Sequence, residues 1–556
     1  MKKQSLLFLL LLFTLCSFGQ LKQSQAIDSL FSDWNKPDVP GCAIGIVEDG
    51  KLIYSNGYGI ADLEHDLQIT PTSVFYIGSV SKQFVTFSIL LLEEQGKLNL
   101  DDKIQKYLPD FPEYDSTLTI RNFIHHTSGV RDYLTLMYLK GRNYLDNTDV
   151  DEVYQLIKNQ KELNFKPGEK YLYSNSCYFM LAMIIEKAAG QSLRDYAQEN
   201  IFQPLGMKNS LFYDDNTDLI KNRVFSYSKK PDEEGFNNLI MRFDLVGSGG
   251  VYSSIEDMYL WDQNFYNNKL GKGGQSIIDK MHEEGLLNNG ESSGYAFALN
   301  NGTYKGLKTV SHGGALAGYR AQLMRFPEEN FSVIILANRG DANPTRKSFQ
   351  IADILLKNKF IEKPKKKNRK IEKKKTTSPE QKFTLNQLAG NYEIQAGVVL
   401  EITLKNDSLN VLQTWNKSSY NITNTTGNTY EIPNDSSIQF EFSGLKDDFT
   451  QTLKVFQNGN ETICKRKEGL DLASLNMEDY TGKYYSEELD VTYLLFLEDE
   501  KLKVKVANHD SLELTINETD IFISDGNLVR FKRLNGVVTG FELDAGRVTN
   551  LKFERK

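Results

Sequence analysis

Residues 76–98 read YIGSVSKQFVTFSILLLEEQGKL, in which apolar residues recur at helical spacing until Gly96, a typical helix stop. The pattern predicts a buried helix over residues 80–95. Ser79 precedes its first turn, where an unpaired backbone N–H and the positive end of the helix dipole favour an oxyanion. Lys82 returns to the same face one turn later. The stretch therefore predicts a serine nucleophile with a basic neighbour.

The spacing Ser-x-x-Lys has little specificity alone, because the chain repeats it at Ser226 and again at Ser443. Those copies lie in polar stretches that no buried helix follows, whereas the copy at Ser79 has the context that the mechanism requires. A serine hydroxyl also needs a base within reach. The side chains of lysine and tyrosine have pKa values near ~10. To lower either pKa to neutral pH, burial or a nearby cation must supply about 4 kcal/mol.

A second motif offers such a group. Tyr173-Ser174-Asn175 comes just before another amphipathic helical pattern, residues 177–189. Tyr-x-Asn also occurs at Tyr266, so the order and spacing of the two motifs carry more weight than either motif alone. Together, Ser-x-x-Lys and Tyr-x-Asn resemble the penicillin-recognising serine hydrolases, in particular the branch of class C β-lactamases and D-amino-acid peptidases. The resemblance covers residues from about 25 to about 360.

This resemblance implies a role for each residue of the two motifs. Ser79 is the acylated nucleophile, Lys82 and Tyr173 form the pair that moves the proton, and Asn175 binds the substrate and the lysine. It also implies an α/β (α+β) domain of the β-lactamase/transpeptidase type, with an antiparallel sheet flanked by helices. An acyl-enzyme route needs no metal and no organic cofactor.

The chain departs from the family in the third motif, where Lys-Thr-Gly is replaced by His-Gly-Gly from His312. His-x-Gly versions resemble D-aminopeptidase-like and esterase-like members. The missing lysine weakens the case for antibiotic hydrolysis, because it is the cation that attracts a substrate carboxylate. Gly314 allows backbone to approach the substrate, and the N–H of Ala315 is the predicted partner of the Ser79 N–H in an oxyanion hole. His312 is expected to hydrogen-bond Tyr173 or the substrate.

The composition changes after residue 362. Residues 363–375 hold nine lysines or arginines, which predicts a solvated linker over 363–380 in preference to a surface for anionic polymers. Beyond it, LAGNYEIQAGVVLEITLK from Leu388 aligns with YTGKYYSEELDVTYLLFLE from Tyr480, with Gly390 matching Gly482. Short alternating strands in both copies predict two small antiparallel, lipocalin-like β-barrels over 381–468 and 469–556, after a catalytic domain over 21–362.

Residues 1–20, MKKQSLLFLLLLFTLCSFGQ, have the charge and apolar run of a secretory signal peptide. The run is shorter than the about 20 residues of a membrane span, so no stable span is expected after its removal. Cys16 raises a lipoprotein alternative, which the bulky Leu15 before it disfavours. The protein is therefore expected to be periplasmic or secreted.

Length, net charge and cysteine content make several classes of protein improbable for this chain. The chain has 556 residues, too many for one core, and its net charge of −8 and clumped basic residues predict no nucleic-acid partner. After signal removal Cys42, Cys177 and Cys464 remain, which predicts no disulfide framework. With no paired-cysteine or His-Glu-x-x-His spacing, no metal site is predicted, and the adjacent His125 and His126 are interpreted as a structural turn.

These features predict an exported serine hydrolase acting on D-residue peptides, small amides or esters, with cell-wall-derived peptides among the candidate substrates. One alternative is a β-lactamase or D,D-carboxypeptidase. A third reading is a non-catalytic penicillin-recognising sensor, which the complete set of Ser79, Lys82, Tyr173 and Asn175 disfavours. The layout resembles D-aminopeptidases with two C-terminal barrels, one of which limits substrate size. Deletion of residues 381–556 is therefore expected to change the substrate range.

Overall fold

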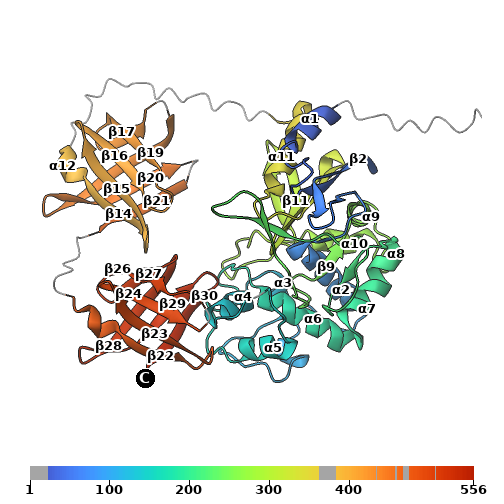
Figure 1. Cartoon of the computed structure of the whole chain (residues 1–556), viewed down its shortest axis with the longest axis horizontal. Helices are drawn as coiled ribbons and strands as arrows, with labels where there is room; N and C mark the ends of the chain where they lie inside the picture. Colours follow the sequence, from blue (N-terminus) through green and yellow to red (C-terminus); the bar gives the residue numbers. More distant parts are fainter. Residues whose placement is uncertain are drawn as a thin grey trace, which may run out of the picture. The chain divides into compact units, whose positions relative to one another are not determined.

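The computed structural model describes residues 23–143, 145–361, 383–433, 435–457, 460–467, 475–507 and 509–556. The described residues divide into two compact units, one of residues 23–138 and 142–361 and the other of residues 139–141 and 383–556 (Figure 1). The predicted signal peptide over 1–20 and the predicted linker over 363–380 lie outside the described residues. Each helix within the described ranges is too short or too polar to cross a lipid bilayer.

A six-stranded antiparallel sheet forms the centre of the first unit, in the order β10-β11-β12-β13-β1-β2. Its strands are β1 (Cys42–Glu48), β2 (Lys51–Tyr58), β10 (Asn300–Tyr304), β11 (Leu307–Leu316), β12 (Tyr319–Phe326) and β13 (Phe331–Ala337). Asp49 and Gly50 form the turn between β1 and β2 with φ of 48° and 75°, as a two-residue hairpin turn requires. β1 pairs along its length with β13, so strands from the two ends of this unit meet inside the sheet.

Helices cover both faces of this sheet. Ile44 and Ile46 of β1 belong to an apolar cluster that also holds residues of α1 (Ser24–Leu30) and α11 (Pro344–Leu355). Gly45 faces the opposite layer, because a Cβ on it would lie 2.7 Å from Cγ2 of Ile255 in α9 (Ile255–Asn264). Burial on both faces explains why β1 is a continuous apolar run without polar alternation.

Two long buried helices, α2 (Lys82–Glu94) and α6 (Asn175–Ala189), pack against each other in this unit (Figure 1). The first two residues of the predicted helix over 80–95 belong to a 3-10 turn, η1 (Gly78–Ser81), so the α-helix itself begins at Lys82. The shorter helices are α3 (Ile120–Ile124), α4 (Tyr133–Leu139), α5 (Val150–Lys158), α7 (Leu193–Ala197), α8 (Gln203–Leu205) and α10 (Gln275–Met281). The small sheets contain β3 (Ile60–Asp62), β4 (Leu67–Gln68), β5 (Phe75–Tyr76), β6 (Leu211–Phe212), β7 (Tyr227–Lys229), β8 (Phe236–Asn238) and β9 (Val251–Ser253).

The second unit contains the internal repeat as two antiparallel β structures, which confirms the predicted class of these domains. The first is a closed barrel of β14 (Gly390–Gln395), β15 (Val398–Lys405), β16 (Ser408–Gln413), β17 (Ser419–Thr426), β18 (Thr429–Ile432), β19 (Asp435–Lys446), β20 (Phe449–Gln457) and β21 (Asn460–Lys467), preceded by α12 (Leu385–Leu388). The second is a nearly closed nine-stranded sheet of β22 (Gly482–Ser486), β23 (Val491–Glu498), β24 (Lys501–Val506), β25 (Leu512–Glu513), β26 (Thr515–Glu518), β27 (Ile521–Ser524), β28 (Asn527–Leu534), β29 (Val537–Ala545) and β30 (Val548–Arg555).

The matched glycines of the repeat have the same structural role. Gly390 begins β14 and Gly482 begins β22, with φ of 149° and 134°. A Cβ at these positions would lie 2.0 Å from the guanidinium of Arg466 and 3.1 Å from that of Arg555, respectively. Each arginine comes from the last strand of its repeat and donates to backbone carbonyls just before the glycine. The glycines therefore make room for a cation that ties the last strand to the first.

Candidate active site

Ser79 and Lys82 meet at the beginning of α2. Nζ of Lys82 lies 3.1 Å from Oγ of Ser79 and 3.0 Å from Oδ1 of Asn175, and it also donates to the carbonyl oxygen of Ser248. Lys82 is fully buried. An ammonium has three hydrogens and no lone pair, so three oxygen partners fit its protonated form. A protonated Lys82 in this arrangement donates a hydrogen bond to Oγ of Ser79.

Tyr173 lies beside the same ammonium. Nζ of Lys82 is 4.8 Å from the centroid of the Tyr173 ring and 5.3 Å from that of Tyr178. Aromatic faces at this range attract a cation, the more so when both are desolvated. The backbone N–H of Asn175 donates to Oδ2 of Asp132 at 2.7 Å, which holds the first residue of α6 in place. The structure therefore brings the other three predicted residues, Ser79, Tyr173 and Asn175, around Lys82.

The predicted oxyanion donors lie on two segments that touch. A Cβ on Gly314 would lie 1.9 Å from the carbonyl oxygen of Ile77 and 3.0 Å from the backbone N of Ser79. A Cβ on Gly78 would lie 2.6 Å from the backbone N of Ala315. Glycines permit this close approach of β11 to η1. The N–H groups of Ser79 and Ala315 thus come from neighbouring backbone segments, as an oxyanion hole requires.

His312 lies on β11 and is only 4% exposed. Its ring nitrogens bond Tyr295 and Gly313, and not Tyr173, which is one of the two partners expected from the sequence. Nε2 lies 2.8 Å from the hydroxyl of Tyr295 and Nδ1 lies 2.6 Å from the carbonyl oxygen of Gly313, while the centroid of the Tyr173 ring is 6.4 Å from that of His312. Burial, and then the charge of Lys82, lower the pKa of His312 to about 4. The ring is therefore neutral at pH 7.

Sequence reasoning missed two groups of this site, Ser248 and Tyr295. Ser248 acts through its carbonyl, and a carbonyl has no signature in the residue type. The glycines on both sides of Ser248 were a signal, since Gly247 has φ of 98° and a Cβ on Gly249 would lie 2.3 Å from the hydroxyl of Tyr76. Nothing in the stretch around Tyr295 indicated that its hydroxyl meets a histidine 17 residues later.

His125 and His126 support the loops around the site, in agreement with their interpretation as structural. Nδ1 of His125 lies 3.1 Å from the carbonyl oxygen of Tyr295, and Nδ1 of His126 accepts from the N–H of Ser174 at 3.2 Å. Burial lowers the pKa of His125 to about 4. Both rings therefore link segments that carry site residues.

The two other Ser-x-x-Lys copies lie in different environments. Oγ of Ser226 donates to the carbonyl of Leu239 at 3.1 Å and accepts from the N–H of Gly318 at 3.2 Å, so it joins loops. Ser443 is a strand residue of β19 that pairs with Thr452. Neither serine precedes a helix.

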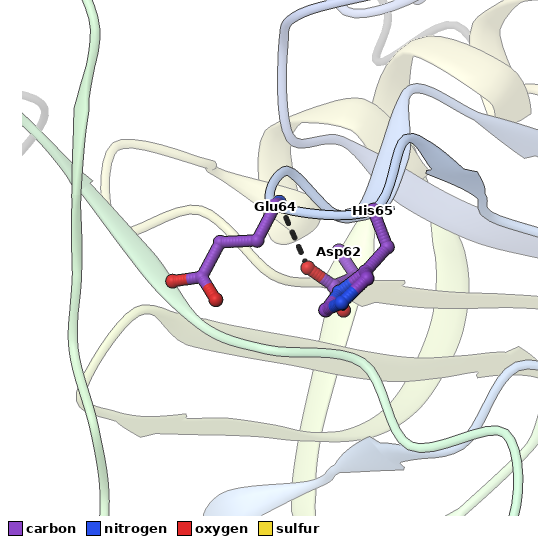
Figure 2. Close-up of side chains that lie close together, drawn as sticks. All are labelled: Asp62, Glu64 and His65. Carbon is purple, nitrogen blue, oxygen red and sulfur yellow. Dashed lines mark hydrogen bonds and ion pairs between the residues drawn. The ribbon is translucent and has the colours of Figure 1, made fainter.

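One group of metal-type side chains lies outside the site: Asp62, Glu64 and His65 (Figure 2). One ligand atom of each lies within 4.8 Å of the others. Oδ1 of Asp62 accepts from the N–H of Glu64 at 2.9 Å, and Oδ2 lies 2.8 Å from Nδ1 of His65. These bonds close the turn between β3 and β4, so the cluster is explained by local turn contacts.

Known proteins are similar in sequence to the first unit. The family model described as Beta-lactamase matches residues 27–355. Penicillin-binding protein 4* of Bacillus subtilis (strain 168) is 30% identical over 383 residues, which cover 65% of this chain and 81% of that protein. A D-aminopeptidase of Brucella anthropi is 30% identical over 319 residues, which cover 57% of this chain and 59% of that protein.

Solved structures show the same fold. The octameric penicillin-binding protein homologue from Pyrococcus abyssi has a TM-score of 0.54 at 20% identity and matches 88% of this chain and 99% of its own. The D-amino acid amidase from Ochrobactrum anthropi SV3, in complex with L-phenylalanine amide, has a TM-score of 0.52 at 19% identity over 61% of this chain and 99% of its own. At these identities the likeness extends to the fold alone.

Proposed function

Because this chain belongs to the Beta-lactamase family and is a serine hydrolase of that fold, we propose that it forms an acyl-enzyme at Ser79 and releases the acyl group to water. The observation that carries the proposal is the buried ammonium of Lys82, held between Oγ of Ser79 and Oδ1 of Asn175. A serine hydroxyl beside a fixed cation and near a tyrosine has the neighbours that nucleophilic catalysis needs.

The proposed acylation starts with Tyr173 as the base. Its phenolate is stabilised by the ammonium of Lys82, takes the proton of Ser79 and frees Oγ to attack the substrate carbonyl. The tetrahedral oxyanion accepts hydrogen bonds from the N–H groups of Ser79 and Ala315, each typically worth about 3 kcal/mol in the transition state. Tyr173 then returns the proton to the leaving amine or alcohol. Water repeats the sequence at the acyl carbon and regenerates the serine.

We propose amides and esters, including those of D-amino acids, as the substrates. The D-aminopeptidase relative supports this class, and so does His312, which is neutral where the family motif has a lysine. A neutral ring offers no fixed charge for a substrate carboxylate. The similarity to penicillin-binding protein 4* favours D,D-carboxypeptidase or β-lactamase action as the second candidate.

We also propose that the protein is exported, with residues 1–20 as its signal peptide and a periplasmic or secreted location. Support comes from the two lysines followed by an apolar run at the N-terminus. N-terminal sequencing of the mature protein tests this proposal, since export by this route leaves a chain that starts after residue 20.

The direct test of the site is intact-mass analysis after incubation with a fluorophosphonate. We expect one adduct on the unchanged protein, none on Ser79→Ala and one on Ser226→Ala, the matched control at a second Ser-x-x-Lys copy. An adduct that persists in Ser79→Ala refutes the assignment. Turnover of nitrocefin, a p-nitrophenyl ester and D-alanine amide then separates the substrate classes, and turnover confined to nitrocefin contradicts the preferred class.

A further inference from the structure

The hydrogen-bond partners of His312 determine which of its ring nitrogens carries the proton. The carbonyl oxygen of Gly313, 2.6 Å from Nδ1, can only accept a hydrogen bond. A neutral imidazole has one N–H, so this hydrogen must be on Nδ1 and Nε2 must be an acceptor. The hydroxyl of Tyr295, 2.8 Å from Nε2, is then the donor.

Tyr295 is held from several sides. It is 1% exposed, and its carbonyl oxygen lies 3.1 Å from Nδ1 of His125. The centroid of its ring lies 4.8 Å from that of His126 and 5.8 Å from that of Tyr171. A ring packed on its faces and fixed through its backbone presents its hydroxyl in one direction, which here is toward His312.

The groups that face His312 come from three elements. Lys82 on α2 is the charged group whose field acts on the ring, Tyr173 lies before α6, and Tyr295 belongs to the segment before β10. Tyr178 of α6 donates its hydrogen to the carbonyl of Ile124 at 2.9 Å, so toward Tyr295 its oxygen is an acceptor that competes with Nε2 of His312. With Nδ1 of His312 bonded to a carbonyl, the hydroxyl of Tyr295, 2.8 Å from Nε2, is the group placed to donate to His312 from this side.

We propose that Tyr295 is a positioning residue of the Ser79 site, whose hydroxyl donates to Nε2 of His312 and thereby holds that ring, protonated on Nδ1, against the backbone of β11. His312 precedes Ala315 by three residues on this strand, and the Nδ1 hydrogen bond fixes the carbonyl of Gly313 between them. The pair therefore stiffens the strand edge that supplies the second oxyanion donor. Nε2 is occupied by Tyr295 and is not the proton donor to Tyr173 or to substrate. This inference rests on the proposed function of the site.

The first experiment does not depend on catalysis. Nitrogen-15 NMR of the imidazole rings, with His312→Gln to assign the His312 signals, reports the tautomer directly. We expect the form protonated on Nδ1 in the unchanged protein from pH 5.5 to pH 8. In Tyr295→Phe, which keeps the ring and removes the donor, we expect a mixture of tautomers. A His312 ring protonated on Nε2 or on both nitrogens in the unchanged protein at pH 7 overturns the proposal.

The second experiment measures hydrolysis of a p-nitrophenyl ester by the full chain. We expect kcat of Tyr295→Phe to fall 10-fold to 100-fold with KM changed less than threefold, and its pH profile to change below pH 6. Tyr319→Phe is the matched control, because that buried hydroxyl donates to the carbonyl of Val224 at 2.6 Å and lies away from His312. An unchanged kcat and pH profile in Tyr295→Phe refute the positioning role. If Ser79→Ala still hydrolyses the ester, the proposed function fails, while the NMR result stands.

Discussion

At the scale of single residues, the site is organised around one buried polar side chain, Lys82. Lys82 is fully buried, yet oxygens of Ser79, Asn175 and Ser248 surround its ammonium. A buried charge without partners costs several kcal/mol, roughly the stability of a small domain, so such a cation persists when its partners are fixed. The arrangement therefore couples the chemistry of Ser79 to the positions of residues far away in the chain.

Replacing Lys82 tests this coupling. We expect Lys82→Gln to lower kcat/KM for a p-nitrophenyl ester by about 10²- to 10⁴-fold, because the serine and the proposed tyrosine base lose their cation. Lys187→Gln is the control, since Lys187 is exposed on α6. A Lys82→Gln enzyme that retains the activity of the control contradicts the proposed role of the ammonium.

The pKa of His312 predicts a dependence of stability on pH. Its folded value of about 4 lies below the ordinary 6.5, so between these pH values the unfolded chain binds a proton that the folded chain does not. The free energy that the neutral His312 ring contributes to folding is fully present above pH 6.5. It decreases as the pH falls, by about 3 kcal/mol at pH 4. We expect the thermal midpoint of the first unit to fall less between pH 7 and pH 4.5 in His312→Gln than in the unchanged protein. Equal slopes in calorimetry contradict the assignment.

At the scale of elements, the site depends on how closely β11 approaches η1. The 3-10 turn Gly78–Ser81 delays the start of α2, and Gly78 has φ of 55°, in the region that favours glycine. Gly314 on β11 leaves no room for a side chain against the carbonyl of Ile77. The proposed oxyanion hole is thus formed by two backbone segments in contact.

A methyl group at Gly314 therefore separates these elements. Its Cβ would lie 1.9 Å from a backbone oxygen, which cannot move away as a flexible side chain does. We expect Gly314→Ala to lower kcat by at least about 10²-fold, the typical cost of one oxyanion donor. Gly302→Ala on neighbouring β10, where a Cβ meets Oγ1 of Thr309 at 3.0 Å, serves as the control. Similar rates for the two variants mean that β11 does not form the oxyanion hole.

At the scale of the whole molecule, a hydrolase unit is followed by a duplicated β unit. Every described side chain that we place around Ser79 belongs to the first unit. In the second unit, Arg466 and Arg555 occupy matching places and tie the last strand of each repeat to its first. The repeat therefore conserves a means of closing each β structure.

The closing arginine predicts a local effect on stability. We expect Arg466→Gln to destabilise the first barrel by about 2–3 kcal/mol, because charge-assisted hydrogen bonds to backbone carbonyls are lost. Lys454→Gln, which removes a partly exposed ion pair with Glu461, is the control and should change stability by less than about 1 kcal/mol. Calorimetry of the full chain checks both, and equal midpoints for the two variants contradict the role of Arg466.

Deletion of residues 381–556 tests the role of the second unit in catalysis. We expect the shortened protein to retain acylation by a small p-nitrophenyl ester, since the groups around Ser79 remain. The range of accepted peptide and amide sizes should change. Hydrolysis of a size series of D-alanine amides by both proteins measures this range, and identical profiles contradict the prediction.

The short motifs could be predicted from the order of residues, and the long-range contacts could not. Ser79 with Lys82, and Tyr173 with Asn175, are short motifs at helix starts, and the hairpin at Asp49 follows from turn preferences. Periodicity likewise indicated the paired β repeats, because alternation and turn residues are local properties. The family and the fold class followed from these patterns and are confirmed.

The carbonyl of Ser248, 166 residues from Lys82, and the hydroxyl of Tyr295 enter the site through folding. A carbonyl is the same in every residue, and a tyrosine in a loop has no pattern that names its partner. Packing of α6, β11 and the loops between them sets the protonation of His312 and the contacts of Lys82. Both depend on partners that are far apart in the sequence and come within hydrogen-bond distance when the chain folds.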